Sequence, residues 1–395
     1  MEAYASEWLQ LLIRWIHLIT GIAWIGASFY FVFLDNSLLP PRRQVDVDEG
    51  VGGELWAIHG GGFYRSQKFR IAPAALPAPL HWFKWEAYWT WLSGFALFVV
   101  MYYANARTYM IDPEIADLTP WQAVAISVAL LIAGWIVYDQ LCKRLGLDRD
   151  RLLAAIMVVL IAATAFGVSK VFSGRAAYLQ VGAMLGTIMA WNVFFVIIPG
   201  QRKLVEAKER GEAPDPRYGR EGKQRSVHNN YFTLPVLFIM ISNHYPMTYG
   251  HRYAWLVLVA VMLLAAYVRH FFNLRHHGRT VWAIPVSAAL AALALAAAIA
   301  PDKPAASTVP PFAQVQAIIT QRCASCHAEK PTQEGLAAAP KGFMLDTPAA
   351  IVGNAQKIHA QAVATRVMPI GNLTGMTDAE RAQVGAWIAA GAPQK

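Results

Sequence analysis

The chain is poor in cysteine. Only three of its 395 residues are cysteine, and two of these, Cys323 and Cys326, lie in one short motif near the C-terminus. The third, Cys142, stands alone at the end of an apolar run, where a small buried side chain is the expected role. Because the motif uses two cysteines, no pair is left for a structural disulfide, which excludes a disulfide framework.

The chain is also poor in charge. Charged residues make up 15% of the sequence and hydrophobic residues 56%, whereas about a quarter of the residues of a typical soluble domain are charged. Together with 14 tryptophans, this composition predicts a protein embedded mainly in membrane lipid, with aromatic side chains at the interfaces. The net charge of +9 lies mostly in short loops between apolar runs, so nucleic acid is not a predicted partner.

Eight apolar runs are long enough to cross a bilayer as helices, since a span needs about 20 residues. The first run is too long for a cleaved signal peptide and contains Arg14 and His17. The sequence therefore predicts an all-α fold in which residues 1–300 form an eight-helix transmembrane bundle. The predicted spans are approximately residues 9–34, 84–104, 120–141, 152–172, 176–198, 230–249, 253–273 and 281–300.

The positive charges of the loops orient this bundle. The first, third, fifth and seventh loops together contain 20 Lys and Arg residues, whereas the second, fourth and sixth contain four. Cytoplasmic loops carry an excess of Lys and Arg, so the odd-numbered loops are predicted to be cytoplasmic. An even number of spans then places both ends of the chain outside. His270, His276 and His277 lie with arginines in the seventh loop, where we expect a solvated cytoplasmic face.

The segment from Cys323 to His327 reads Cys-Ala-Ser-Cys-His, which is the attachment signature of c-type haem. Its two thiols add to the haem vinyl groups, and His327 supplies the proximal iron ligand. A zinc half-site would need a second pair of ligands, but no further cysteine follows. The motif therefore predicts one covalent haem c.

The flanks of this motif fit a small helical domain. An amphipathic helix is expected over residues 311–320, and a final helix over 378–390, with Thr377 and Glu380 as a capping box. We therefore predict a small all-α cytochrome c domain at residues 312–395, joined to the bundle by a Pro- and Ala-rich linker at 301–311. Haem c is attached outside the bacterial cytoplasm, so the domain is expected on the periplasmic side of the inner membrane, in agreement with the loop charges.

Three methionines are candidates for the sixth iron ligand. They are Met344, Met368 and Met376, and each could also be core filler. Met368 precedes Pro369 about 40 residues after the proximal histidine, which resembles the Met-Pro ligand loop of small bacterial c cytochromes, so Met368 is predicted and His359 is the weaker alternative. Methionine ligation would raise the potential and suit an electron acceptor.

Polar residues within the predicted spans point to a function beyond anchoring, because they are costly in lipid. His17 lies deep in the first span, and its role there is open between a haem ligand, a proton relay and a substrate contact. Candidate site residues in the first loop and at the start of the second span are His59, which precedes three glycines, and Arg65, Trp85 and Glu86. The sixth span opens with His228, Asn229 and Asn230 and closes with Asn243 and His244.

Four of these stretches resemble the membrane domain of bacterial membrane-bound urate hydroxylases, a family that joins such a bundle to a C-terminal cytochrome c. They are residues 14–35, 56–65, 80–95 and 229–246. The resemblance covers essentially the whole chain in the same order. It implies that urate is oxidised to 5-hydroxyisourate, with water as the oxygen source and electrons passed to haem c.

Urate is a planar monoanion near neutral pH, which suits pairing with arginine, hydrogen bonds from amides and aromatic stacking. Arg65, Asn229, Asn230 and Trp85 are therefore the predicted substrate contacts. The oxidation also needs a general base. We take His59, Glu86 and His228 as the candidate catalytic residues.

The predicted topology separates the clusters around His59 and His228 from the haem c by a bilayer core of about 30 Å. Either an intermediate carrier, such as a b-type haem between His17 and His244, connects them, or the substrate pocket lies near the outer surface.

Two other functions remain open at this point. One is a quinol-oxidising cytochrome c subunit of a membrane electron-transfer complex. The other is a membrane-tethered electron shuttle in which the helices serve only as an anchor. The downstream acceptor would be a soluble cytochrome c or a terminal oxidase.

Overall fold

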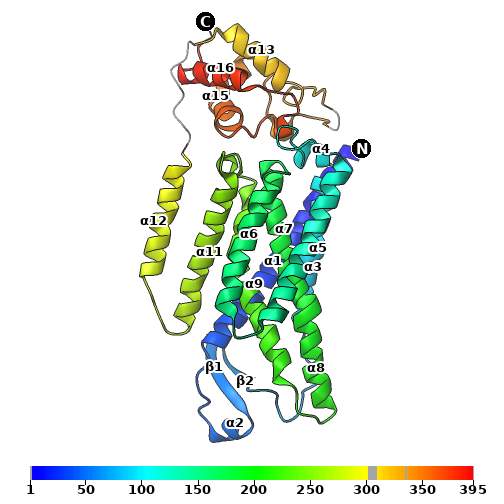
Figure 1. Ribbon diagram of the computed structural model, residues 1–395, viewed down its shortest axis with the longest axis vertical. Coiled ribbons are helices and arrows are strands. Elements are labelled where there is room, and N and C mark those ends of the chain that lie inside the picture. The colour runs from blue at the N-terminus through cyan, green and yellow to red at the C-terminus, as the bar shows by residue number, and fades with distance from the viewer. Residues whose placement is uncertain (1, 301–308, 334–335, 395) are drawn as a thin grey trace.

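The computed structural model describes residues 2–300, 309–333 and 336–394. The structure is mostly helical (67%). A helical bundle lies between a small helical region formed by the C-terminal residues and a β-hairpin at the opposite end (Figure 1). We call the end of the bundle that faces the C-terminal region the outer end, and the end near the hairpin the inner end. Most of the predicted linker at 301–311 lies outside the described residues.

Each of the eight predicted spans is helical over most of its length, and five of the described helices are long and apolar enough to cross a membrane. The protein is therefore a membrane protein. The five are Glu7–Asn36, Pro120–Leu145, Asp150–Val168, Gly174–Glu209 and Ala254–His276. The elements of the bundle are α1 (Glu2–Asn36), α3 (Trp85–Phe98) with the π-helical turn η1 (Val99–Tyr103), α4 (Ala106–Tyr109), α5 (Pro120–Leu145), α6 (Asp150–Val168), α7 (Gly174–Asn192), η2 (Val193–Ile197), α8 (Ile198–Glu209), α9 (Pro216–Ser242), α10 (Pro246–Tyr249), α11 (Ala254–His276) and α12 (Ala283–Ala298).

The predicted bounds of the fifth and sixth spans were wrong. Helix α7 continues through η2 into α8, because a π-helical turn accommodates Pro199, whose ring and missing N–H disturb a regular helix. Helix α9 starts at Pro216, behind the N-cap Asp215, well before the predicted residue 230. It ends at Ser242, and Pro246 begins the separate short helix α10. A helix that starts in a basic, polar segment has no apolar pattern to reveal its first turns.

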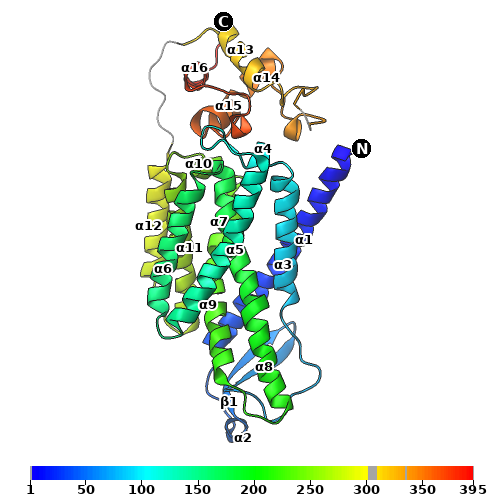
Figure 2. The ribbon, with the colours of Figure 1, turned by 45° about the vertical axis from the view of Figure 1, so that its right-hand side comes forward.

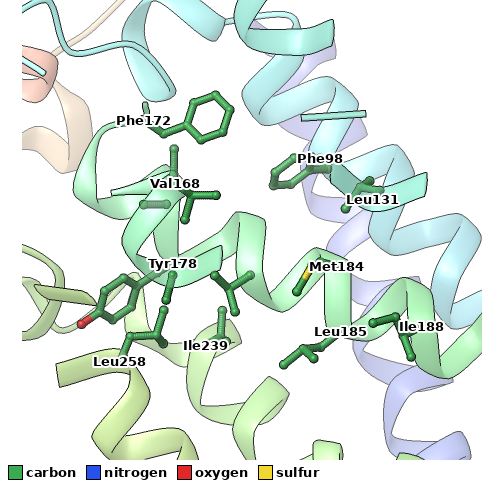
Figure 3. Packing of buried hydrophobic residues seen from close by; sticks show 14 of the residues in the cluster. Phe98, Leu131, Val168, Phe172, Tyr178, Met184, Leu185, Ile188, Ile239 and Leu258 are labelled. Atoms are coloured by element: carbon green, nitrogen blue, oxygen red, sulfur yellow. The ribbon is translucent and has the colours of Figure 1, made fainter. Parts of the chain in front are cut away.

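The core of the bundle lies around α7, which packs between α5, α6 and α9 (Figures 1 and 3). Small residues allow this close packing: a Cβ added to Gly182 would lie only 2.5 Å from the Ile239 side chain. Helix α1, by contrast, contacts mainly α3 and exposes large apolar side chains such as Trp15 and Ile22. Such a surface suits lipid.

The first loop contains a β-hairpin, which the all-α prediction missed. Strands β1 (Val51–His59) and β2 (Gly62–Phe69) are antiparallel, and His59 pairs with Gly62. The glycines between them, Gly60 and Gly61, both have positive φ angles, as a two-residue type I′ turn requires. The glycine run thus serves a turn. The short helix α2 (Gln44–Asp48) precedes the hairpin.

The C-terminal residues 309–394 form a helical region with a separate hydrophobic core that includes Ile319, Ile351 and Trp387. The two predicted helices are confirmed, and Thr377 and Glu380 make the expected capping box. The elements are α13 (Phe312–Arg322), η3 (Pro340–Gly342), α14 (Pro348–Gly353), α15 (Ala355–Ile358), η4 (His359–Ala364), η5 (Ile370–Asn372) and α16 (Asp378–Ala389).

This C-terminal region sits on the outer end of the bundle, next to α4 and α10 (Figure 2). Two glycines allow the backbones to meet: a Cβ on Gly250 would lie 2.2 Å from the Thr365 oxygen, and one on Gly371 would lie 2.9 Å from the Ile111 oxygen. Asn372 also donates a hydrogen bond to Glu114 at 2.7 Å. The N-terminal end of α1 lies at the same end of the molecule (Figure 1).

Candidate functional site

A cavity of about 1840 Å³ lies between the outer end of the bundle and the C-terminal region. Cys323, His327 and Met368 line it from the C-terminal side. His17, Arg175 and other residues of the bundle line it from below. The attachment motif and the outer end of the bundle therefore share one space.

The proximal histidine of the motif is held in a defined orientation. His327 Nδ1 donates a hydrogen bond to the Phe343 carbonyl oxygen at 2.9 Å. Nε2 is therefore the atom left for a metal, an arrangement typical of metal-binding histidines. Cys326 is half-buried but does not line the cavity.

Of the three candidate methionines, Met368 is the one that lines this cavity. Arg381 holds its loop by donating a hydrogen bond to the Met368 carbonyl oxygen at 2.7 Å. Met376 is buried in the core of the region, and Met344 is 43% exposed. His359 does not line the cavity either. Met368 is therefore the candidate methionine that shares the cavity with Cys323 and His327, and its role as the sixth ligand stays a prediction.

Arginine and aromatic side chains form the floor of the cavity at the outer end of the bundle. Arg175, at the start of α7, donates a hydrogen bond to Asn243 at 2.8 Å. Its guanidinium carbon lies 5.9 Å from the ring centroid of Tyr102 and 5.7 Å from that of Tyr109. Because loop charge alone drew attention to Arg175 in the sequence, this cluster was not predicted.

His17 and His244 both line the same cavity. His17 Nδ1 lies 3.0 Å from the Thr90 carbonyl oxygen and 3.1 Å from the Ser93 hydroxyl. These partners leave Nε2 of His17 available to a ligand. His244 is exposed, just beyond the end of α9. A b-type haem between the two histidines stays a prediction.

His228 and Asn229 belong to a polar network inside the bundle. The Tyr138 hydroxyl lies 2.8 Å from His228 Nδ1. Asn192 Nδ2 donates hydrogen bonds to the same hydroxyl at 3.1 Å and to Asn229 Oδ1 at 3.0 Å. Nearby, the buried Arg225 pairs with the buried Asp139 at 2.8 Å. Most of its polar atoms bond to one another, but Asn192 Oδ1 and Arg225 Nη1 are buried and have no hydrogen-bond partner among the described residues.

Asn230 faces a different neighbour, Arg269 on α11. Arg269 Nε donates a hydrogen bond to Asn230 Oδ1 at 2.9 Å, and Asn273 donates to the same oxygen at 3.0 Å. Arg269 is only 4% exposed, contrary to the solvated loop expected for the arginines near His270. His270 and His277 are exposed as predicted, but His276 is half-buried and its Nδ1 is buried, so the prediction was wrong for His276. The signal that the sequence offered for Arg269 was its position just inside the apolar run of the seventh span.

Arg65 and His59 lie on the hairpin, away from these clusters. Arg65 pairs with Asp46 and with Glu54, whose Oε2 is 2.8 Å from Arg65 Nε. Hydrogen bonds from Arg65 hold the pKa of Glu54 below its usual range. The carboxylates of Asp46 and Glu54 are therefore both paired with Arg65. His59 is exposed at the end of β1.

Trp85 and Glu86 begin α3. Trp85 is 59% exposed, and the Lys84 ammonium lies 5.3 Å from its ring centroid. Glu86 is half-buried. In the described part of the chain, no hydrogen bond or ion pair joins Glu86, His59 and His228, so the structure does not bring the three candidate bases together.

Residues 3–300 match the urate oxidase N-terminal family. No curated protein and no solved structure matches the chain.

Proposed function

The chain belongs to the urate oxidase N-terminal family, and on that premise we propose that it is a membrane-bound urate hydroxylase that delivers electrons to a covalent haem c. The family implies an oxidoreductase acting on urate. The observation that carries the proposal is the match over residues 3–300, which covers the whole bundle. The shared outer cavity supports the link from this bundle to the haem-attachment motif.

The proposed reaction balances without molecular oxygen, because water supplies the oxygen atom. Urate and one water give 5-hydroxyisourate, two protons and two electrons, so one C–O bond forms at urate and two electrons leave the substrate, for which two one-electron reductions of haem are required. A base must take a proton during this step. Of the three candidates, His228 is the one held inside the bundle by a hydroxyl, that of Tyr138. His59 and Glu86 stay predictions.

The residues of the C-terminal region fit a haem c. Cys323 and Cys326 would hold its vinyl groups, and His327 and Met368 would ligate its iron, because the Nε2 of His327 is free and Met368 lines the same cavity. When bound, the haem accepts electrons one at a time and passes them to a soluble cytochrome c or a terminal oxidase. The hydrogen bonds from His327 to the Phe343 carbonyl oxygen and from Arg381 to the Met368 carbonyl oxygen would keep the two ligands in place.

We propose that all eight apolar helices cross a bacterial inner membrane and that the C-terminal cytochrome c domain, residues 312–395, faces the periplasm. The N-terminal end of α1 and the C-terminal region lie at the same end of the molecule (Figure 1), as an even number of crossings requires. The basic loops and the hairpin then lie on the cytoplasmic side.

An anaerobic visible spectrum of the detergent-purified, oxidised protein tests this function. Adding urate should give the reduced α-band of a c-type haem together with loss of the urate absorbance. A second α-band would reveal a b-type haem, and His17 and His244 would then be the candidate ligands to substitute. If urate leaves the haem oxidised while a quinol reduces it promptly, the protein is a quinol-oxidising cytochrome c subunit and the urate proposal is wrong.

A further inference from the structure

Arg269 is a buried cation without an anion. Its side chain is 4% exposed, and its guanidinium carbon lies 3.9 Å from the ring centroid of Phe29 on α1. No carboxylate lies within ion-pair distance of Arg269 among the residues that the structure describes. A buried charge normally has such a partner, because removing it from water is costly.

Several other polar atoms around Arg269 also lack partners. Arg269 Nη2, Asn230 Nδ2, Asn273 Oδ1 and His276 Nδ1 are buried and have no hydrogen-bond partner in the described part of the chain. The side chains themselves are held in place, since Arg269 and Asn273 both donate to Asn230 Oδ1. Buried polar groups are nearly always hydrogen-bonded, so several unsatisfied atoms in one held cluster indicate a ligand.

The chemistry of the free atoms specifies that ligand. Arg269 Nη2 and Asn230 Nδ2 offer N–H donors and a positive charge, whereas Asn273 Oδ1 offers an acceptor. Urate presents what this set lacks, namely carbonyl oxygens, ring N–H groups and a single negative charge in one plane. Aromatic rings of α1 close the cluster, because Phe33 contacts His276 edge-on at 5.4 Å between centroids.

We propose that Arg269, Asn230 and Asn273 form the urate-binding site; this inference rests on the proposed function and adds where its substrate binds. Asn230 lies ten residues before Met240, which lines the outer cavity from α9, and at 1.5 Å per residue this places Asn230 about 15 Å from that cavity. The substrate therefore binds in the inner half of the bundle and its electrons travel outward.

Urate binding to protein pre-reduced with dithionite tests the site, because a reduced protein cannot accept electrons and does not turn over. Equilibrium dialysis with radiolabelled urate gives the dissociation constant. Arg269→Gln should weaken binding by about 10- to 100-fold, the range expected for losing hydrogen bonds to a charged group. Arg269→Lys should retain part of the affinity. Arg275→Gln, an exposed arginine of the same helix, is the matched control and should bind urate normally.

Asn273→Asp separates a ligand site from a structural role. The new carboxylate lies one helical turn from Arg269 and supplies the missing anion within the protein. This variant should therefore exclude urate as strongly as Arg269→Gln while unfolding at the wild-type temperature or above. Inorganic phosphate, which has no planar ring and no N–H groups, should not displace urate from the wild-type protein.

The outcomes distinguish this site from the proposed function. If urate reduces the wild-type haem but binds normally to both Arg269→Gln and Asn273→Asp, the site is wrong and the function stands. If urate binds in an Arg269-dependent way but never reduces the haem, the site stands and the function is wrong. If the wild-type protein neither binds urate nor is reduced by it, both are wrong. Displacement of urate by phosphate would show a general anion site and overturn the assignment to urate.

Discussion

The outer cavity and the inner cluster around Arg269 are both polar, but they are built for ligands of different size. The outer cavity is large and is lined by Cys323, His327 and Met368 from a separate region of the chain. The inner cluster is enclosed by three helices of the bundle and offers a few donor and acceptor atoms. The proposals above assign a macrocyclic cofactor to the first region and a small planar anion to the second.

Two buried arginines sharpen this contrast. Arg225 and Arg269 are 3% and 4% exposed, but Arg225 pairs with Asp139 at 2.8 Å, whereas no ion pair is formed by Arg269 in the described part of the chain. The Asp139 carboxylate is also paired with Lys143 at 2.6 Å. Among the described residues, one guanidinium nitrogen of each arginine lacks a hydrogen-bond partner, so the two residues differ in their carboxylate partner. A charge that is paired with a carboxylate supports the fold, and one without a carboxylate can select a ligand.

The largest expected effect comes from the outer cavity. Substituting both Cys323→Ser and Cys326→Ser should eliminate covalent haem and all urate-driven reduction, because the thioether bonds cannot form. Urate binding at the inner cluster should remain within roughly twofold of wild type, since the two regions are about 15 Å apart by the rise of α9. Haem staining after denaturing electrophoresis and equilibrium dialysis measure the two effects. Haem that stays covalently attached in this variant would show that Cys323 and Cys326 are not the attachment residues.

The two arginines should differ in stability. Arg225→Gln leaves Asp139 buried with only Lys143 as partner, and breaking a buried pair typically costs about 3–5 kcal/mol. Arg269→Gln removes an uncompensated charge, so the ligand-free protein should be unchanged or more stable. Unfolding in detergent measures both. A large destabilisation by Arg269→Gln would show that Arg269 is structural, and the contrast between the two residues would disappear.

Urate should stabilise the wild-type protein by about 2.7 kcal/mol at one hundred times its dissociation constant, because it binds the folded state alone. The shift should vanish in Arg269→Gln and persist in Arg225→Gln, provided the latter folds. Thermal unfolding of dithionite-reduced protein, with and without urate, gives the comparison. A urate-dependent shift of equal size in Arg269→Gln would place the substrate elsewhere, with Arg175 in the outer cavity as the next residue to substitute.

Met368→Leu should act on the outer region alone. Loss of the thioether ligand should lower the reduction potential of the attached haem, since methionine ligation raises it. The haem should stay covalently bound and the affinity for urate should be unchanged. A redox titration followed at the α-band measures the potential. An unchanged potential would show that Met368 is not the sixth ligand, and Met344 and Met376 would be the next candidates.

The smallest effect is expected at the hairpin, which lies outside both regions. The pKa of Glu54 is lowered in the folded protein by hydrogen bonds from Arg65, so its contribution to hairpin stability is present above the pKa of an unfolded Glu, about 4.3. That contribution is lost as the pH falls through the folded pKa. The protection factors of the β1 and β2 amides, which compare each exchange rate with the intrinsic rate at the same pH, should therefore fall on acidification in the wild type. In Glu54→Gln the protection factors should be low at neutral pH already and change less with acid.

Much of the fold followed from the sequence, because apolar length and loop charge act locally. The eight helices and the Thr377 capping box depend on such local patterns. The hairpin was missed because its glycines fit a ligand loop as well as a turn, and only the pairing of β1 with β2 decides between them. The first turns of α9 were missed because the residues there are polar and basic. Such residues show no apolar pattern, and their contacts with other helices cannot be read from the sequence.

The candidate site was harder to predict, since it depends on which partners meet in three dimensions. Asn229 and Asn230 are neighbours in the sequence, yet they face Asn192 on α7 and Arg269 on α11 respectively. Arg65 looked available for an anion, but Asp46 and Glu54 already pair with it. The haem-attachment prediction for Cys323, Cys326 and His327 could be made from sequence alone, because that chemistry requires a fixed spacing, and it stays a prediction.

The most direct test of the account is an anaerobic titration of the oxidised protein with less urate than haem. We predict that each urate consumed reduces two haem equivalents, because the oxidation releases two electrons and each haem iron accepts one. Urate that disappears without haem reduction, or only after oxygen is admitted, would contradict the claim that its electrons leave through the C-terminal haem.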